Sequence, residues 1–118
     1  MTVTQENVRQ HEIGMDQWAS FIDAFVHAHE EQAATMEIFS ATGSLLESRS
    51  GQLRGLKLDS RRDIQRAFLE LHQPMHGNIA YVIACPVRMI VREGDSHKEL
   101  EITSADGRKT LLQLEPRD

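Results

Sequence analysis

The strongest structural signal in the sequence is a β-hairpin near its C-terminal end. Residues 98–114 form two runs of alternating apolar and polar side chains around the dipeptide Asp106-Gly107. Asp-Gly between two such runs is among the strongest short-range signals of a hairpin turn. The signal indicates a β-rich fold, and it determines which side chains of this segment share a face.

The register of this hairpin depends on the length of its loop. A two-residue loop places Leu100 opposite the polar Gln113, whereas a three-residue loop, 105–107, places Leu100 opposite Leu112. A shift of one residue moves every side chain to the other face, so the apolar pairing decides between the two loops. We therefore predict a three-residue loop with Gly107 in the left-handed conformation, which glycine adopts without a Cβ clash.

Length and composition predict one globular domain. The chain has 118 residues, of which 40% are hydrophobic and 26% are charged, as is typical of a folded protein with a single core. We expect residues 1–13, which are polar and aperiodic, to be a flexible arm and residues 14–118 to form the domain. The chain has no apolar run that could span a bilayer, no secretory signal and one cysteine, so we expect a cytoplasmic protein.

An amphipathic helix is predicted before the strands. Asp16 is a plausible N-cap, and helical periodicity continues from Gln17 to about Glu31. We expect the apolar stripe of this helix to pack against a sheet or to plug an open barrel end, and the alternative is a helix that binds a partner. The stripe comprises Trp18, Phe21, Ile22 and Phe25, with Val26 at its edge.

Short strands are predicted after the helix. Residues 34–41 and 52–59 read as strands, with a Ser- and Gly-rich loop at 44–51 between them. Gly55 marks a bulge, because the apolar residues before and after it are out of phase. Residues 79–92 form the longest β-prone run, and its first half is apolar on both faces, as is typical of a central strand. Pro86 cannot donate to a β-ladder, so it marks a bend, a bulge or an exposed edge.

Residues 59–72 satisfy two incompatible patterns. Ser60 and Asp63 resemble a capping box, and Ile64, Ala67, Phe68 and Leu71 fit an apolar helical stripe. Read as a strand, the segment places Ala67, Leu69 and Leu71 on one face. The apolar spacing alone favours the helix.

Three stretches resemble an uncharacterised bacterial domain-of-unknown-function family, number 5335. They are Asp16-Gln17-Trp18-Ala19-Ser20-Phe21, Cys85-Pro86-Val87-Arg88-Met89, and Leu100 to Gly107 followed by Thr110-Leu111-Leu112. The resemblance covers about residues 14–114 and implies a strand at 63–71, which is why we predict a strand there. It implies no activity, cofactor or catalytic residue. The chain is also similar to Sm-like and other SH3-like small barrels in the order of its elements. A shorter similarity to the second strand of Sm proteins lies in Gly51-Gln52-Leu53-Arg54-Gly55, with Asp59 after it.

No set of residues predicts catalysis or metal binding. His27 and Glu31 have helical i, i+4 spacing, but the sequence fixes no third ligand. Cys85 lies in an apolar run and is interpreted as a buried structural side chain. There is no Gly-x-Ser-x-Gly elbow and no glycine-rich phosphate loop. We therefore predict no enzyme activity, no metal and no cofactor. The other histidines considered are His11, His29, His72, His76 and His97.

Basic side chains gather in the middle third of the chain, which has a net charge of −5 overall. One interpretation of this group is a salt-bridged, solvent-facing surface, and the other is a contact surface for an anion or RNA. The six residues are Arg49, Arg54, Lys57, Arg61, Arg62 and Arg66.

The sequence as a whole predicts an α+β, mainly β fold: an N-terminal amphipathic helix followed by five or six antiparallel strands in a bent sheet or small half-open barrel. Short strands leave edges that need covering, often by self-association. We therefore expect a non-enzymatic cytoplasmic binding or assembly module whose partner is itself, as a homo-oligomer, or another protein. The alternative is a weak RNA-binding, Sm-like barrel that uses the arginine-rich face.

Overall fold

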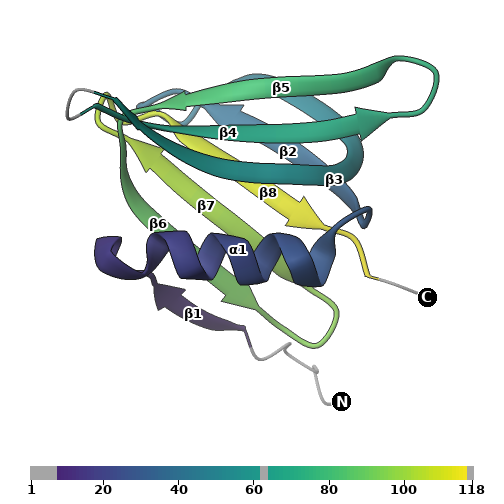
Figure 1. The fold of residues 1–118 in the computed structure, drawn as a ribbon, viewed down its shortest axis with the longest axis horizontal. Coiled ribbons are helices and arrows are strands. Elements are labelled where there is room, and N and C mark those ends of the chain that lie inside the picture. Colours follow the sequence, from purple (N-terminus) through teal and green to yellow (C-terminus); the bar gives the residue numbers. More distant parts are fainter. Residues whose placement is uncertain (1–7, 62–63, 117–118) are drawn as a thin grey trace, which may run out of the picture.

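The computed structural model describes residues 8–61 and 64–116, which form one curved sheet and one α-helix (Figure 1). A 3-10 turn, Met15–Gln17, leads into helix α1, Trp18–His29. No helix in the described part of the chain is long and apolar enough to cross a membrane. The strands are β1 (Arg9–Glu12), β2 (Ala33–Phe39), β3 (Leu45–Arg61), β4 (Ile64–Gln73), β5 (Gly77–Ala84), β6 (Pro86–Glu93), β7 (Lys98–Ser104) and β8 (Lys109–Leu114).

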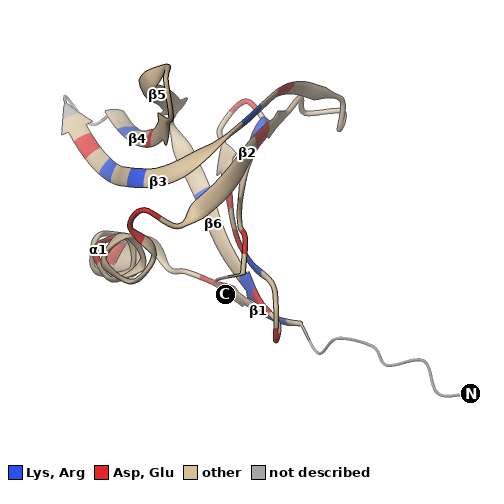
Figure 2. Ribbon diagram, turned by 90° about the vertical axis from the view of Figure 1, so that its right-hand side faces the viewer, with Lys and Arg blue, Asp and Glu red and all other residues tan. Residues whose placement is uncertain are grey.

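All eight strands belong to one antiparallel sheet. Their order is β1-β6-β7-β8-β2-β3-β4-β5, so within residues 8–61 and 64–116 β1 and β5 are the two edges and the sheet does not close. Figure 2 shows how strongly the sheet curves, with α1 below β3. Its inner face and α1 enclose a single apolar core.

The predicted element order is wrong in two respects. A strand, β1, precedes the helix, and the sheet has eight strands where five or six were expected. Polar residues make up β1, so no apolar alternation marks it. It is held by backbone pairing to β6 and by Arg88, whose Nε donates to Glu12 Oε1 at 2.7 Å. Residues 1–7 of the predicted arm lie outside the described residues.

Strand β3 is longer than predicted because residues 45–51 extend it. These residues, expected as a loop, pair with β2, whereas 52–61 pair with β4. The strands pass so close at Gly51 that a Cβ there would lie 2.7 Å from the carbonyl oxygen of His72. The predicted bulge is confirmed, because the β3–β4 register shifts between Leu53 and Gly55.

Helix α1 presents its predicted apolar stripe to the core. Trp18, Ile22 and Phe25 are buried. Asp16 does not cap the helix, because the 3-10 turn places Gln17 at the N-cap position, without a side-chain cap bond. The indole Nε1 of Trp18 instead donates to the Ile13 carbonyl at 2.8 Å.

The strand at β4, which the family resemblance implied against the apolar spacing, and the predicted C-terminal hairpin are both confirmed. Residues 64–73 form a strand, with Ala67, Leu69 and Leu71 buried. In the hairpin, Leu100 pairs with Leu112, and Gly107 has a φ of +92°.

Candidate functional site

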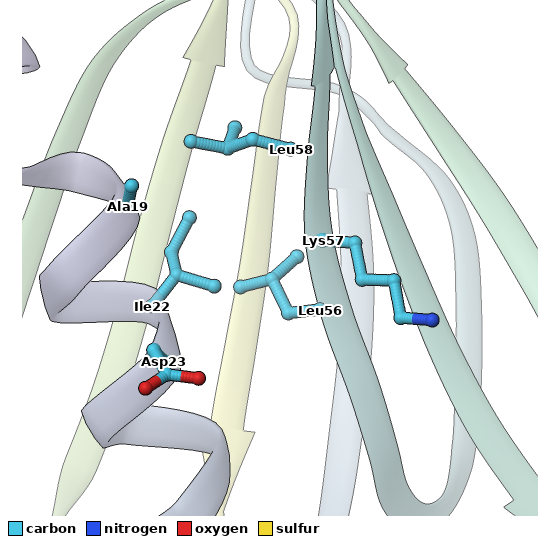
Figure 3. A pocket seen from close by; sticks show the side chains of 6 residues that line it. All are labelled: Ala19, Ile22, Asp23, Leu56, Lys57 and Leu58. Carbon is cyan, nitrogen blue, oxygen red and sulfur yellow. The ribbon is translucent and has the colours of Figure 1, made fainter.

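A groove of about 280 Å³ runs between α1 and β3 (Figure 3). Ile22 of the helix and Leu56 of the strand point toward one another across it, and the Lys57 side chain points away. Asp23 supplies the one carboxylate. A single carboxylate beside aliphatic side chains offers no nucleophile–base or acid–base pair, so the groove can hold an apolar group and has no evident chemistry. Its lining is Ala19, Ile22, Asp23, Leu56, Lys57 and Leu58.

The two edge strands of the sheet differ in length and charge. β1 has four residues, and three of them, Arg9, His11 and Glu12, are ionisable or charged. β5 has eight residues, Gly-Asn-Ile-Ala-Tyr-Val-Ile-Ala, with no Asp, Glu, Lys, Arg, His or Pro. In Figure 2, β5 accordingly carries neither blue nor red. Charges and prolines are the usual protection of an exposed edge, and β5 has neither.

Backbone geometry identifies the residues whose polar groups face outward from β5. The Cys85 amide donates to the Gln65 carbonyl at 3.0 Å, in the same register as the β4–β5 ladder. Hydrogen-bonded and non-bonded pairs alternate along an antiparallel ladder. Residues 79, 81 and 83 therefore bond to β4, and the N–H and C=O groups of Asn78, Ala80, Val82 and Ala84 point away from it.

We call this outward side the free edge of β5. Among the described residues, β4 is the only strand paired with β5. Ala80, Val82 and Ala84 are exposed, and the Val82 side chain is 57% exposed. A cavity of about 110 Å³ lies beside the C-terminal end of β5, at residues 82–84. Its lining also includes polar side chains at or near the β7–β8 loop, among them Ser104, Asp106 and Arg108.

On the inner face of the sheet, a side chain of β5 contacts an ion pair on β3. The Tyr81 hydroxyl donates to Glu47 Oε1 at 3.3 Å, and Glu47 also pairs with Arg49 at 3.3 Å. Partial burial, and then the negative charge of Glu47, raise the pKa of the Tyr81 phenol above its ordinary value of 10.0. Tyr81 therefore remains a neutral hydrogen-bond donor at physiological pH.

Of the six basic residues predicted as a contact surface, the four whose side chains the structure describes do not share one face of the sheet. Arg49 pairs with Glu47, Arg54 with Glu31 at 2.9 Å, and Arg66 with Asp59 at 3.9 Å. Lys57 and Arg66 share the outer face with Phe68, since Lys57 pairs directly with Phe68, and the Arg66 guanidinium lies 5.9 Å from the ring centroid. The Arg61 side chain and Arg62 lie outside the described residues.

Cys85 differs from the sequence interpretation. It is exposed and has a φ of +45°, at the single residue that joins β5 to β6. Two backbone bonds hold this conformation: its amide donates to Gln65, and its carbonyl accepts from Ala105 at 2.9 Å. In the described part of the chain, no group of three or more His, Cys, Asp or Glu side chains is placed to hold a metal ion.

The sequence of the chain matches one known protein family. The model of a family of unknown function, DUF5335, matches residues 9–118. The chain belongs to DUF5335. The matched range contains the helix and all eight described strands, and it confirms the resemblance to this family that the sequence shows. No curated protein and no solved structure matches the chain.

The sequence pattern did not indicate the free edge of this DUF5335 member. The run that contains β5 is apolar on both faces, a pattern that predicts a central strand. The structure instead places it at the end of the sheet. An absence of charge has the same appearance in a buried central strand and in an unprotected edge, so only the strand order separates the two.

Proposed function

We propose that this protein is a non-enzymatic assembly module that self-associates by strand pairing at the free edge of β5. The supporting observation is that β5, an eight-residue strand, has a strand partner on one side only among the described residues and carries no charge and no proline. An exposed strand edge is a template for another strand, and proteins that stay monomeric protect such edges. β1 has this protection and β5 lacks it.

Self-association is supported over the two other functions considered. The α1–β3 groove supplies one carboxylate and no partner group for catalysis. For RNA binding, three of the four predicted basic side chains that are described already pair with carboxylates. The net charge of −5 also disfavours a phosphate backbone as partner. The free edge needs neither a catalytic group nor positive charge.

A charge on the free edge provides the test. Val82→Lys places an ammonium on the outer face of β5, where a paired strand would partly desolvate it, so we expect association to weaken at least about tenfold, or about 1.4 kcal/mol. Val87→Lys is the matched control, because Val87 is 46% exposed on β6 and Val82 is 57% exposed. Light scattering after size exclusion, over a concentration series, measures the molar mass.

The proposal requires a specific pattern among the three proteins. Wild type and Val87→Lys should show the same rise of molar mass with concentration, and Val82→Lys should need at least about tenfold more protein to reach the same molar mass. A wild type that remains monomeric at every concentration contradicts the proposal. An oligomer that Val82→Lys leaves intact also contradicts it, because association would then use another surface.

A further inference from the structure

We infer that the strand that pairs with β5 is β5 of a second copy, antiparallel and centred on Tyr81. This inference rests on the proposed function, and it adds the identity of the partner surface and its register. The alternative partner surface within the chain is β1, the other edge. β1 offers four residues with charges of both signs, so it covers at most half of the eight-residue β5 edge and places charges against an apolar strand.

The positions of the outward-facing backbone groups restrict the register. In an antiparallel pair, the two residues of a hydrogen-bonded pair both direct their N–H and C=O groups across the interface. Only Asn78, Ala80, Val82 and Ala84 do so on β5. Centring the pair on Tyr81 matches all four of them: 78 with 84 and 80 with 82, in both directions. Centring the pair on Ala80 matches three of them, because Ala84 then falls opposite a residue outside the strand. Centring it on Val82 also matches three, because Asn78 then does so.

The side chains of β5 are nearly palindromic about the same centre. Ile79-Ala80-Tyr81-Val82-Ile83 reads almost identically in both directions. The register centred on Tyr81 therefore pairs Ile79 with Ile83 of the second copy, and Tyr81 with Tyr81. Aromatic and β-branched cross-strand pairs each stabilise a sheet. No like charges meet along the strands, although each copy has a net charge of −5.

The symmetry of this pair limits the assembly to a dimer. A two-fold contact uses the same surface on both copies, so each copy consumes its one free β5 edge. The joined sheet has β1 at both ends, and β1 is short and carries Arg9, His11 and Glu12. The assembly therefore closes at two copies and does not grow into a filament.

Cysteine cross-linking tests the register directly. In a Cys85→Ser background, which removes the native thiol, Ala80→Cys and Val82→Cys are made as separate proteins. Both sites are exposed, so both variants should fold. In the register centred on Tyr81, residue 80 faces residue 82 of the second copy at about 5.5 Å between Cα atoms, which is within disulfide range. Mixing the two variants under mild oxidation should give several times more disulfide-linked dimer than either variant alone.

Each outcome of the cross-linking has one meaning. Dominant linkage in the mixture supports the inference. Linkage by Ala80→Cys alone indicates a centre on Ala80, and linkage by Val82→Cys alone indicates a centre on Val82; either overturns the register while the β5 assembly stands. An oligomer that is sensitive to Val82→Lys but gives no linkage in any sample overturns β5 as the partner surface. A wild type that is monomeric by light scattering overturns the proposed function itself.

Discussion

Replacing Trp18 by alanine is expected to lower the free energy of unfolding by about 3–5 kcal/mol, the usual cost of deleting a buried aromatic side chain. Trp18 is 1% exposed and begins α1. Its indole donates to the Ile13 carbonyl, and the Ile13 amide donates to the Met89 carbonyl of β6 at 2.8 Å. One side chain therefore joins the helix, the segment that follows β1, and the core.

Urea unfolding followed by circular dichroism measures this effect, since Trp18 is the only tryptophan and its fluorescence is lost in the variant. Trp18→Phe retains the apolar ring and loses the N–H bond, so about 1–2 kcal/mol is expected. Met15→Ala, at a side chain that is 59% exposed, is the control and should change stability by less than about 0.5 kcal/mol. A Trp18→Ala cost as small as the control would show that the helix is not anchored in this way.

Replacing Arg92 by leucine is the second large effect that we expect, at about 2–4 kcal/mol of lost stability. The Arg92 guanidinium contacts Glu99 at 3.2 Å and Glu101 at 3.3 Å. These carboxylates are only 11% and 13% exposed. Arg92 also donates from Nε to Gln10 Oε1 of β1 at 2.9 Å. Without the guanidinium, two neighbouring carboxylates share a poorly solvated site, and β1 loses one of its contacts.

Two comparisons separate this effect from a general loss of surface charge. Arg108→Leu removes one partner of the Asp106–Arg108 pair, whose side chains are both 62% exposed, and exposed pairs contribute at most about 1 kcal/mol. Adding Glu99→Gln and Glu101→Gln to Arg92→Leu should restore most of the stability, because the uncompensated charges are gone. Equal losses for Arg92→Leu and Arg108→Leu in urea titrations would contradict the account of the Arg92 site.

Local features of the fold could be predicted from the sequence. The hairpin register follows from the apolar pairing at Leu100 and from Gly107, both within a few residues of the turn. The buried helix stripe and the bulge before Gly55 follow in the same way from spacing along the chain. These predictions succeed because the interactions that determine them join residues close in the sequence.

The remaining features depend on contacts between distant segments. β1 consists of polar residues and is a strand only because β6 lies beside it. Residues 45–51 pair with β2, but no local pattern marks them as a strand, because they include Ser and Gly and most of them are exposed. The basic residues gather in sequence, but their partners Glu31, Glu47 and Asp59 come from segments whose positions spacing does not reveal.

Amide hydrogen exchange of β5 at several protein concentrations tests the central claim most directly. The Tyr81 and Ile83 amides bond to β4 and should exchange slowly at every concentration. The Ala80 and Val82 amides lie on the free edge, so we predict rapid exchange in dilute protein and slow exchange once the edge is paired in concentrated protein. Rapid exchange at Ala80 and Val82 at all concentrations, with Tyr81 and Ile83 still protected, would contradict assembly through this edge.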